Sequence, residues 1–144
     1  MLSNFRGIAR SLIGQPPEVR KRMENELLAR LKKLGFLHET AVLDDVLDLT
    51  IENVVERRMQ TVVFRRGLTK TIQQARQLIT HGHISIGNKR VTVPGYIVAK
   101  KEESQIAYAP QSNLANPSHP IRQTITATPP TEGPRAEARA EEEQ

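Results

Sequence analysis

The sequence predicts an α+β protein with a helical N-terminal region, then two helices on a small antiparallel sheet, and finally a tail. Three observations support this prediction. Apolar residues recur with the helical period through residues 1–50 and again through 51–80. Beyond Gly82 the period changes to two, as in half-buried strands. After Tyr108 the chain is rich in proline and poor in apolar residues, so residues 109–144 are expected to form an extended or disordered tail.

Helix-breaking residues bound the elements of the N-terminal region. A first helix is expected to end at Gly14. Pro17 should stand near the first position of a second helix, which Gly35 closes. A short further segment follows over residues 43–49. Together these elements make residues 1–50 a helical region of their own.

The next helix is expected to begin after Thr50 as its N-cap and to run to about Arg66, with Gly67 as a left-handed C-cap. At about 100° per residue, its apolar residues gather on one side and its basic residues fall beside them. That basic strip contains Arg57, Arg58, Thr61 and Arg65. The helix should therefore present one packed side and one basic side.

A capping box marks the start of a second helix. The Thr71 hydroxyl and the Gln74 amide are expected to bind each other's free backbone N–H groups. The apolar side of this helix packs inward, whereas the other side carries hydrogen-bonding groups, before Gly82 ends the helix. Those polar residues are Gln73, Arg76, Gln77, Thr80 and His81.

Beyond Gly82 a β-hairpin is expected, because apolar and polar residues alternate and Gly87-Asn88 stands where a tight turn requires positive φ. Residues 96–98 and 105–108 are candidates for further strands around an exposed link. The sheet should be small and antiparallel.

Charge is distributed unevenly along this second region, residues 51–108. The stretch from Arg57 to Arg90 holds eight basic residues and no acid, whereas an ordinary solvated face mixes both signs. Because the stretch covers the expected solvent faces of three consecutive elements, it predicts a surface for a polyanion. The basic residues expected to contact phosphates are Arg57, Arg58, Arg65, Arg66, Lys70, Arg76, Lys89 and Arg90.

Structured RNA is the expected polyanion. The chain contains three Phe, two Tyr and no Trp, which are too few for a platform that stacks single-stranded bases. Recognition should therefore rely on phosphates, 2′-hydroxyls and shape. The residues expected to position the RNA backbone or its 2′-hydroxyls are Thr71, Gln73, Gln77, His81 and His83.

The first 17 residues carry Arg6 and Arg10 without an acid, on a helix-compatible apolar pattern. That composition is typical of a mitochondrial presequence and equally of a helix that contacts RNA. We favour the second interpretation, with Arg6 and Arg10 as further RNA contacts, and leave mitochondrial import open.

Other classes of function find little support in the residues. The chain contains no cysteine, which excludes disulfides, thiolate metal sites and cysteine nucleophiles. His81 and His83 lack the further ligands of a zinc site, and no nucleophile stands beside paired acids such as Glu52 and Glu56. We expect no enzyme, no cofactor, no metal and no small-molecule substrate, and no apolar run is long enough for a membrane. A DNA-binding winged helix-turn-helix stays open as an alternative, although no dimerising segment is evident.

Four sequence segments resemble one known family: Leu47-Asp48-Leu49-Thr50, Glu56 through Leu68, Gln74 through Ile79, and His81-Gly82-His83-Ile84. They are similar to small-subunit ribosomal protein four of the archaeal and eukaryotic kind. The resemblance covers about residues 5–108 and is most specific over 47–98. That family carries an RNA-binding module, the alpha-L motif, with two helices packed on a small antiparallel sheet.

The resemblance implies a cytoplasmic, ribosomal protein that is not an enzyme. It would bind the five-prime domain of small-subunit ribosomal RNA, help nucleate subunit assembly and contact neighbouring small-subunit ribosomal proteins. It also implies that residues 1–50 lie on the same RNA. A free-standing RNA-binding assembly or quality-control factor is the alternative. The chain departs from the family at Ile72, where many modules have a basic residue, at Gly87-Asn88, where Asn-Gly is usual, and ahead of Phe5, where a longer basic segment is usual.

Overall fold

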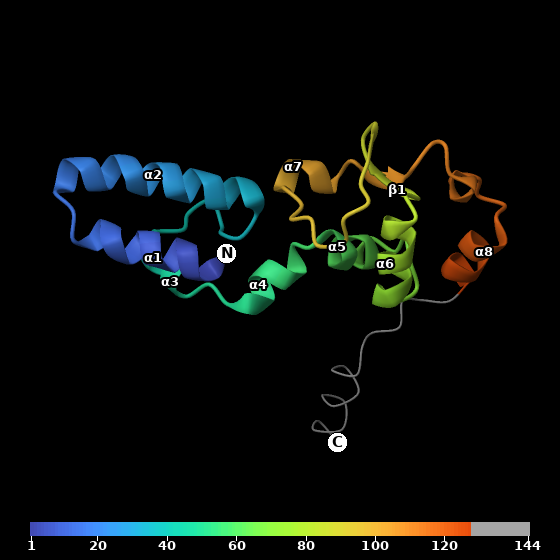
Figure 1. Ribbon diagram of the computed structural model, residues 1–144, viewed down its shortest axis with the longest axis horizontal. Coiled ribbons are helices and arrows are strands. Elements are labelled where there is room, and N and C mark those ends of the chain that lie inside the picture. Colours follow the sequence, from blue (N-terminus) through green and yellow to red (C-terminus); the bar gives the residue numbers. More distant parts are fainter. Residues whose placement is uncertain (128–144) are drawn as a thin grey trace, which may run out of the picture.

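The computed structural model describes residues 1–127, which form an elongated molecule with a helical unit at one end and a helix-and-sheet unit at the other (Figure 1). The helical unit contains α1, α2 and α3, and α4 leads from it into the second unit. The predicted α+β class, with a helical region ahead of a module that contains a small antiparallel sheet, is confirmed.

The helical unit consists of α1 (Leu2–Ile13), α2 (Pro17–Leu34) and α3 (Leu43–Leu47). Pro17 begins α2, where its fixed φ suits the first turn, and Gly35 ends it with a φ of 79°. These predicted boundaries are confirmed. The ring centroids of Phe5 and Phe36 lie 6.5 Å apart in the core of this unit. That core contains Phe5, Ala9, Leu12, Leu27, Leu28, Leu31, Phe36, Leu43, Val46 and Leu49.

The expectation of one continuous helix from residue 51 to about 66 is wrong, because the chain forms α4 (Ile51–Glu56) and α5 (Met59–Arg65). Arg58, between them, is extended, with φ −71° and ψ 142°. The backbone here pairs with a distant segment instead. Met59 N donates to Tyr96 O at 2.7 Å, and Val98 N donates to Arg57 O at 2.9 Å. These bonds satisfy the groups that a continuous helix would otherwise use, so the helix stops.

The two expected N-caps are formed only in part. Thr50 precedes α4, but its side chain makes no capping bond. Thr71 Oγ1 accepts from Gln74 N at 3.1 Å and so caps α6 (Ile72–Thr80). The Gln74 amide oxygen accepts from Lys70 N at 2.8 Å, one residue before the expected partner. The turn ahead of α6 is therefore fixed from both sides.

Helices α5 and α6 pack against each other and against the sheet. Gly67 and Gly82 end the two helices with φ of 74° and 76°, as expected. The buried residues of this second core are Met59, Val62, Val63, Ala75, Leu78, Ile79, Ile84, Val98, Ile106 and Leu114.

The antiparallel sheet has the order β2-β1-β3, with β1 (Ile84–Ile86), β2 (Lys89–Arg90) and β3 (Ile106–Tyr108). Ser85 pairs with Arg90 on one side and with Ala107 on the other. The expected hairpin is confirmed, and its turn has positive φ at Gly87 but not at Asn88. That sign pattern is the one of a type II′ turn, not type I′.

Residues 96–98, a candidate strand, form only one bridge, between Arg58 and Ile97, and stay outside the sheet. The link that follows contains the short helix α7 (Lys100–Glu103). Ile97 packs against the core of the helical unit, whereas Val98 is buried in the second core. Two consecutive residues therefore tie the two units together.

The tail begins later than residue 109. A 3₁₀ helix, η1 (Asn113–Ala115), and α8 (Pro120–Ala127) follow β3. Leu114 is 3% exposed in the second core, and Ala109 N donates to His83 O at 2.8 Å. The guanidinium carbon of Arg122 lies 4.7 Å from the centre of the Tyr108 ring. Burial of Leu114, the Ala109 hydrogen bond and the Arg122–Tyr108 contact together hold this polar, proline-containing segment on the module. The rest of the expected tail, residues 128–144, lies outside the described residues.

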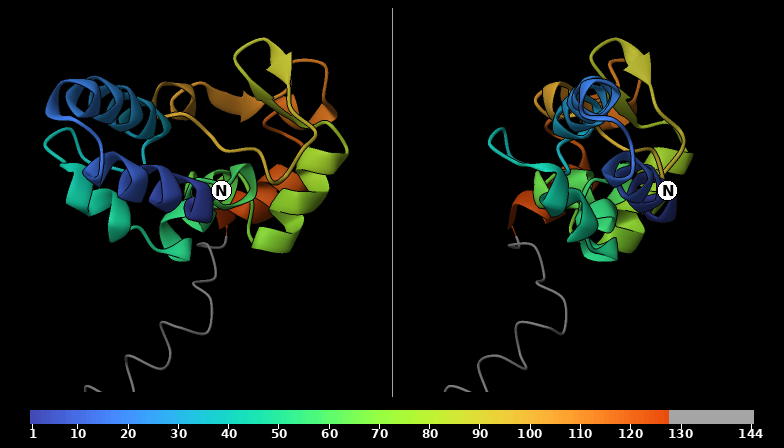
Figure 2. Two further views of the ribbon diagram at one scale, coloured as in Figure 1. Left: turned by 60° about the vertical axis from the view of Figure 1, so that its left-hand side comes forward. Right: turned by 90° about the vertical axis from the view of Figure 1, so that its left-hand side faces the viewer.

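Figure 2 shows the hairpin of β1 and β2 projecting from one side of the second unit, away from the helices of the first. Within residues 1–127, no helix combines the length and apolar character needed to cross a membrane.

Candidate nucleic-acid interface

The solvent-facing side of α6 forms a depression that no acidic residue lines. Its volume is about 590 Å³. The lining residues are Lys70, Thr71, Gln73, Gln74, Arg76, Gln77 and Thr80. Five of these seven belong to the interface predicted from the sequence. All seven carry hydrogen-bond donors, and two carry a positive charge, so the depression suits phosphate and hydroxyl oxygens.

The local fold explains why these side chains converge. The apolar residues of α6 face α5 and the sheet, which turns its polar residues outward. Tyr108 Oη donates to Leu68 O at 2.5 Å and so fastens the turn that leads to Lys70 onto the sheet. Burial raises the pKa of Tyr108, with an opposing effect of Arg122, so this phenol stays a donor at neutral pH.

The structure divides the eight predicted cations by their partners. Arg57 forms an ion pair with Glu103 at 2.8 Å, and Arg65 forms one with Glu56 at 2.9 Å. Both acids lie outside the stretch 57–90, so a charge count over that stretch does not include them. Within residues 1–127 the other six cations form no ion pair. These six are Arg58, Arg66, Lys70, Arg76, Lys89 and Arg90.

Arg57 lies inside the protein rather than on a basic face. Its side chain is 15% exposed, and its Nη2 donates to Val98 O at 2.9 Å. The same nitrogen lies 3.2 Å from the position that a Cβ would take on Gly35. The guanidinium thus joins the end of α2 to the segment after β2. Its phosphate contact stays a prediction, and its contacts give it a structural role.

The expected basic strip on one helix does not form, because α4 and α5 are separate. Arg58 Nη2 lies 3.1 Å from the Cβ position of Gly95, so this guanidinium packs along a turn of the second unit. Arg65 and Arg66 are exposed at the end of α5. Arg66 Nη1 donates to the backbone carbonyl of Glu103. Both arginines are accessible, although Arg66 contacts α7 and Arg65 contacts Glu56.

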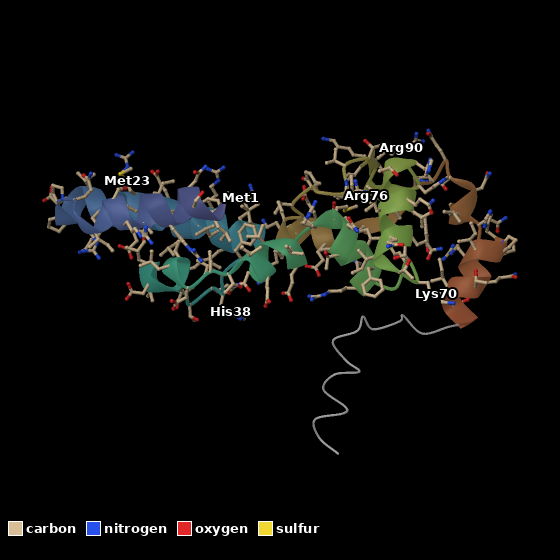
Figure 3. All side chains as sticks on the ribbon, turned by 60° about the horizontal axis from the view of Figure 1, so that its bottom comes forward. Met1, Met23, His38, Lys70, Arg76 and Arg90 are labelled. Atoms are coloured by element: carbon tan, nitrogen blue, oxygen red, sulfur yellow. The ribbon has the colours of Figure 1, made fainter. Side chains whose placement is uncertain are left out.

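Three further predicted residues surround Gly82. The ring centroids of His81 and His83 are 6.5 Å apart. Arg90 Cδ lies 2.8 Å from the position of a Cβ on Gly82, so the arginine crosses the chain where only glycine leaves room. Figure 3 shows Lys70, Arg76 and Arg90 in the half of the molecule that holds α6 and the hairpin. The hairpin therefore extends the positive surface of α6, and exposed Lys89 adds to it.

In the helical unit the two predicted arginines differ. Arg6 is partly buried, and its Nη2 donates to the backbone carbonyl of Leu49, which fastens α1 to the chain ahead of α4. Arg10 is exposed on the same helix. RNA contact by either residue stays a prediction, and Arg10 is the one placed to make it without rearrangement.

Sequence reasoning missed two residues that touch the predicted interface, because they lie in the segment assigned to the tail. Arg90 Nη2 donates to Gln111 Oε1 at 3.0 Å. His83 Nδ1 lies 2.7 Å from Ser112 Oγ. The sequence signals for this segment are its few apolar residues, among them Leu114, Ile121 and Ile125.

A metal centre has no counterpart in the part of the chain that the structure describes. No group of three or more His, Asp or Glu side chains within residues 1–127 is arranged to hold an ion. Of the two predicted histidines, His83 lies within hydrogen-bond distance of Ser112, as described above.

Comparisons with known proteins place the chain among related sequences. The family model of the S4 domain matches residues 57–104. Three relatives are called small ribosomal subunit protein uS4. The protein of Hyperthermus butylicus is 56% identical over 111 residues, which cover 77% of this chain and 63% of the relative. That of Ignicoccus hospitalis is 55% identical over 112 residues, 78% of this chain and 68% of the relative. That of Thermoplasma acidophilum is 48% identical over 131 residues, 88% of this chain and 65% of the relative. The matched part of the chain thus spans about two thirds of the length of each relative.

Proposed function

Because the chain belongs to the family of small ribosomal subunit protein uS4, we propose that it is a structural component of the small ribosomal subunit that binds ribosomal RNA directly. It acts in the cytoplasmic ribosome without catalysis. Its RNA partner is the five-prime domain of small-subunit ribosomal RNA, where it helps nucleate assembly beside neighbouring ribosomal proteins.

One observation carries the proposal: the depression on α6 is lined by Lys70 and Arg76, neither of which forms an ion pair within the described residues. Compensated arginines such as Arg57 and Arg65 need no further anion, but an uncompensated pair attracts one. The positive end of the α6 dipole lies beside Lys70 and Thr71 and favours a phosphate at the same place.

The neutral residues supply geometry. Thr71 Oγ1 accepts the Gln74 N–H, which leaves its own proton for an RNA oxygen. Gln73 and Gln77 are exposed one turn apart and can bind ribose hydroxyls along the helix. The interface thus combines two cations for phosphates with amides and hydroxyls for the sugar edge.

The helical unit favours a ribosomal component over a free-standing RNA-binding factor. It is tied to the module by Arg57, by residues 97–98 and by an ion pair between Lys100 and Glu39 at 3.6 Å. An isolated module would not require this companion.

The test is the salt dependence of binding to a transcript of the five-prime domain. We expect Lys70→Ala with Arg76→Ala to weaken binding and to reduce the log–log salt slope by about 1.4–1.8, because each phosphate contact contributes roughly 0.7–0.9. The matched control is Arg20→Ala with Arg22→Ala, which also removes two cations, but cations that pair with Glu24 and Glu26.

An unchanged slope in the α6 variant, or an equal loss in both variants, would remove the α6 depression from the interface. Sedimentation of a native extract tests the ribosomal role separately. The protein is expected in the small-subunit peak at high salt and in stoichiometric yield. Occurrence on precursor particles alone would replace the structural role by that of an assembly factor.

A further inference from the structure

The segment after β3 contacts two of the predicted RNA-binding side chains, which belong to the module. Gln111 and Ser112 are consecutive, and each contacts one residue of the module: Arg90 at 3.0 Å and His83 at 2.7 Å. Ala109 N, bound to His83 O at 2.8 Å, and buried Leu114 fix the segment on either side of these contacts. The contacts are therefore part of a packed structure.

The hydrogen bonds of Ser112 constrain the His83 ring. Ser112 Oγ already accepts from Leu114 N at 3.1 Å as the cap of η1. Within the described residues its hydroxyl proton has no acceptor other than His83 Nδ1, so donation to Nδ1 is the arrangement that satisfies both groups. A neutral imidazole that accepts at Nδ1 carries its proton on Nε2. The opposite edge of the ring then presents an N–H donor.

Arg90 brings a charge to the same place. Its side chain crosses Gly82, the residue next to His83, and Gln111 takes one N–H of its guanidinium. No other hydrogen bond occupies its guanidinium within residues 1–127, so the remaining N–H groups can bind an anion. A phosphate beside Gly82 would meet a cation and a neutral donor together.

We propose that Ser112 is a positioning residue for RNA: it holds His83 in the Nε2–H tautomer, so that His83 and Arg90 bind one phosphate of the ribosomal RNA. This inference rests on the proposed function and extends the interface beyond the matched S4 domain, which ends at residue 104. Nothing in the sequence of the module itself indicates this role of Ser112.

Nitrogen-15 chemical shifts of the histidine rings in the full chain report the tautomer directly. At a pH of about 8 we expect the Nε2–H pattern for His83. Ser112→Ala should shift that pattern toward a tautomer mixture, and Ser112→Thr, which keeps the hydroxyl, should restore it. Ser118→Ala is the matched control, since the Ser118 hydroxyl donates only to Asn116 in the same segment.

RNA binding tests the consequence. Ser112→Ala is expected to weaken binding to the five-prime-domain transcript about two- to tenfold, the effect of one neutral hydrogen bond, with an unchanged salt slope. Arg90→Ala should lower the slope by roughly 0.7–0.9. The combined variant should lose less than the product of the two effects, because both residues serve one phosphate.

The outcomes separate this inference from the proposed function. Failure of the wild-type chain to bind the transcript would overturn both. If the wild-type chain binds the transcript, three results would overturn the positioning role alone. These are a His83 pattern that does not shift in Ser112→Ala, a shift that Ser112→Thr does not reverse, and effects of Ser112→Ala and Arg90→Ala on RNA binding that are fully additive.

Discussion

Replacing Arg57 should destabilise the protein, although the sequence of the stretch around it predicts RNA binding alone. In Arg57→Met the apolar stem is kept and the guanidinium is lost. Val98 O, in a fully buried residue, then loses its donor, which costs about 1–3 kcal/mol. Glu103 is 43% exposed and regains water, so its lost ion pair adds at most about 1 kcal/mol. The free energy of unfolding should fall by about 1–4 kcal/mol in all.

Thermal unfolding followed by circular dichroism measures this loss, which corresponds to a drop in Tm of roughly 10 °C for a chain of this size. The matched control is Arg22→Met. That residue also pairs with a glutamate, Glu26, but its side chain is 85% exposed. An exposed pair of this kind is worth about 0.5 kcal/mol or less. Both variants lose one charge, so the difference between their Tm values measures the effect of burying the arginine.

The same pair of variants distinguishes a structural from an RNA-binding Arg57. At a temperature well below both transitions, Arg57→Met should keep the salt slope of RNA binding. An unchanged Tm together with a slope lower by roughly 0.7–0.9 would refute the reasoning. Arg57 would then leave its interior site when RNA binds.

Two further predictions concern the fold. Gly67→Ala and Gly82→Ala should each lower the free energy of unfolding in urea by about 1–2 kcal/mol, because both glycines adopt a left-handed backbone conformation with positive φ. Only Gly82→Ala should also weaken RNA binding, because its Cβ would meet Arg90, whereas no atom lies within 4 Å of a Cβ on Gly67; equal RNA affinity of the two variants would contradict this placement of Arg90. The pKa of Tyr108 is raised by burial, so its contribution to stability is present below the unfolded value of about 10 and is lost as the pH rises through the higher folded value. The difference between the urea midpoints at pH ~9 and ~11 should therefore be smaller in Tyr108→Phe than in the wild type. Tyr96, whose pKa is also raised, titrates in both proteins and contributes equally to both differences. An identical pH dependence of the two proteins would mean that ionisation of Tyr108 does not break its bond to Leu68.

Local signals predicted the elements whose ends are set by their own residues. Pro17, Gly35, Gly67 and Gly82 bound helices because φ is restricted or positive at those positions, and no distant contact is needed to infer it. The polar side of α6 was predictable for the same reason, because one helical period fixes which side chains share a face.

Long-range contacts set the features that the sequence could not reveal. The break between α4 and α5 depends on backbone bonds to residues 96–98, about 40 positions along the chain. The interior position of Arg57 depends on Glu103, which is equally distant. The order of residues 109–127 depends on contacts with the module, such as the burial of Leu114 and the bond from Ala109 N to His83 O.

The distribution of acids connects the two functions of the basic stretch. Glu56 stands immediately before it and Glu103 shortly after it, and each pairs with one arginine of the stretch. The cations of α6 and the hairpin form no ion pair within residues 1–127. We therefore expect RNA binding to release counterions for six of these cations rather than eight, about a quarter fewer than the composition suggests. A stretch free of acids can thus contain both structural and ligand-binding arginines, and the fold alone separates them.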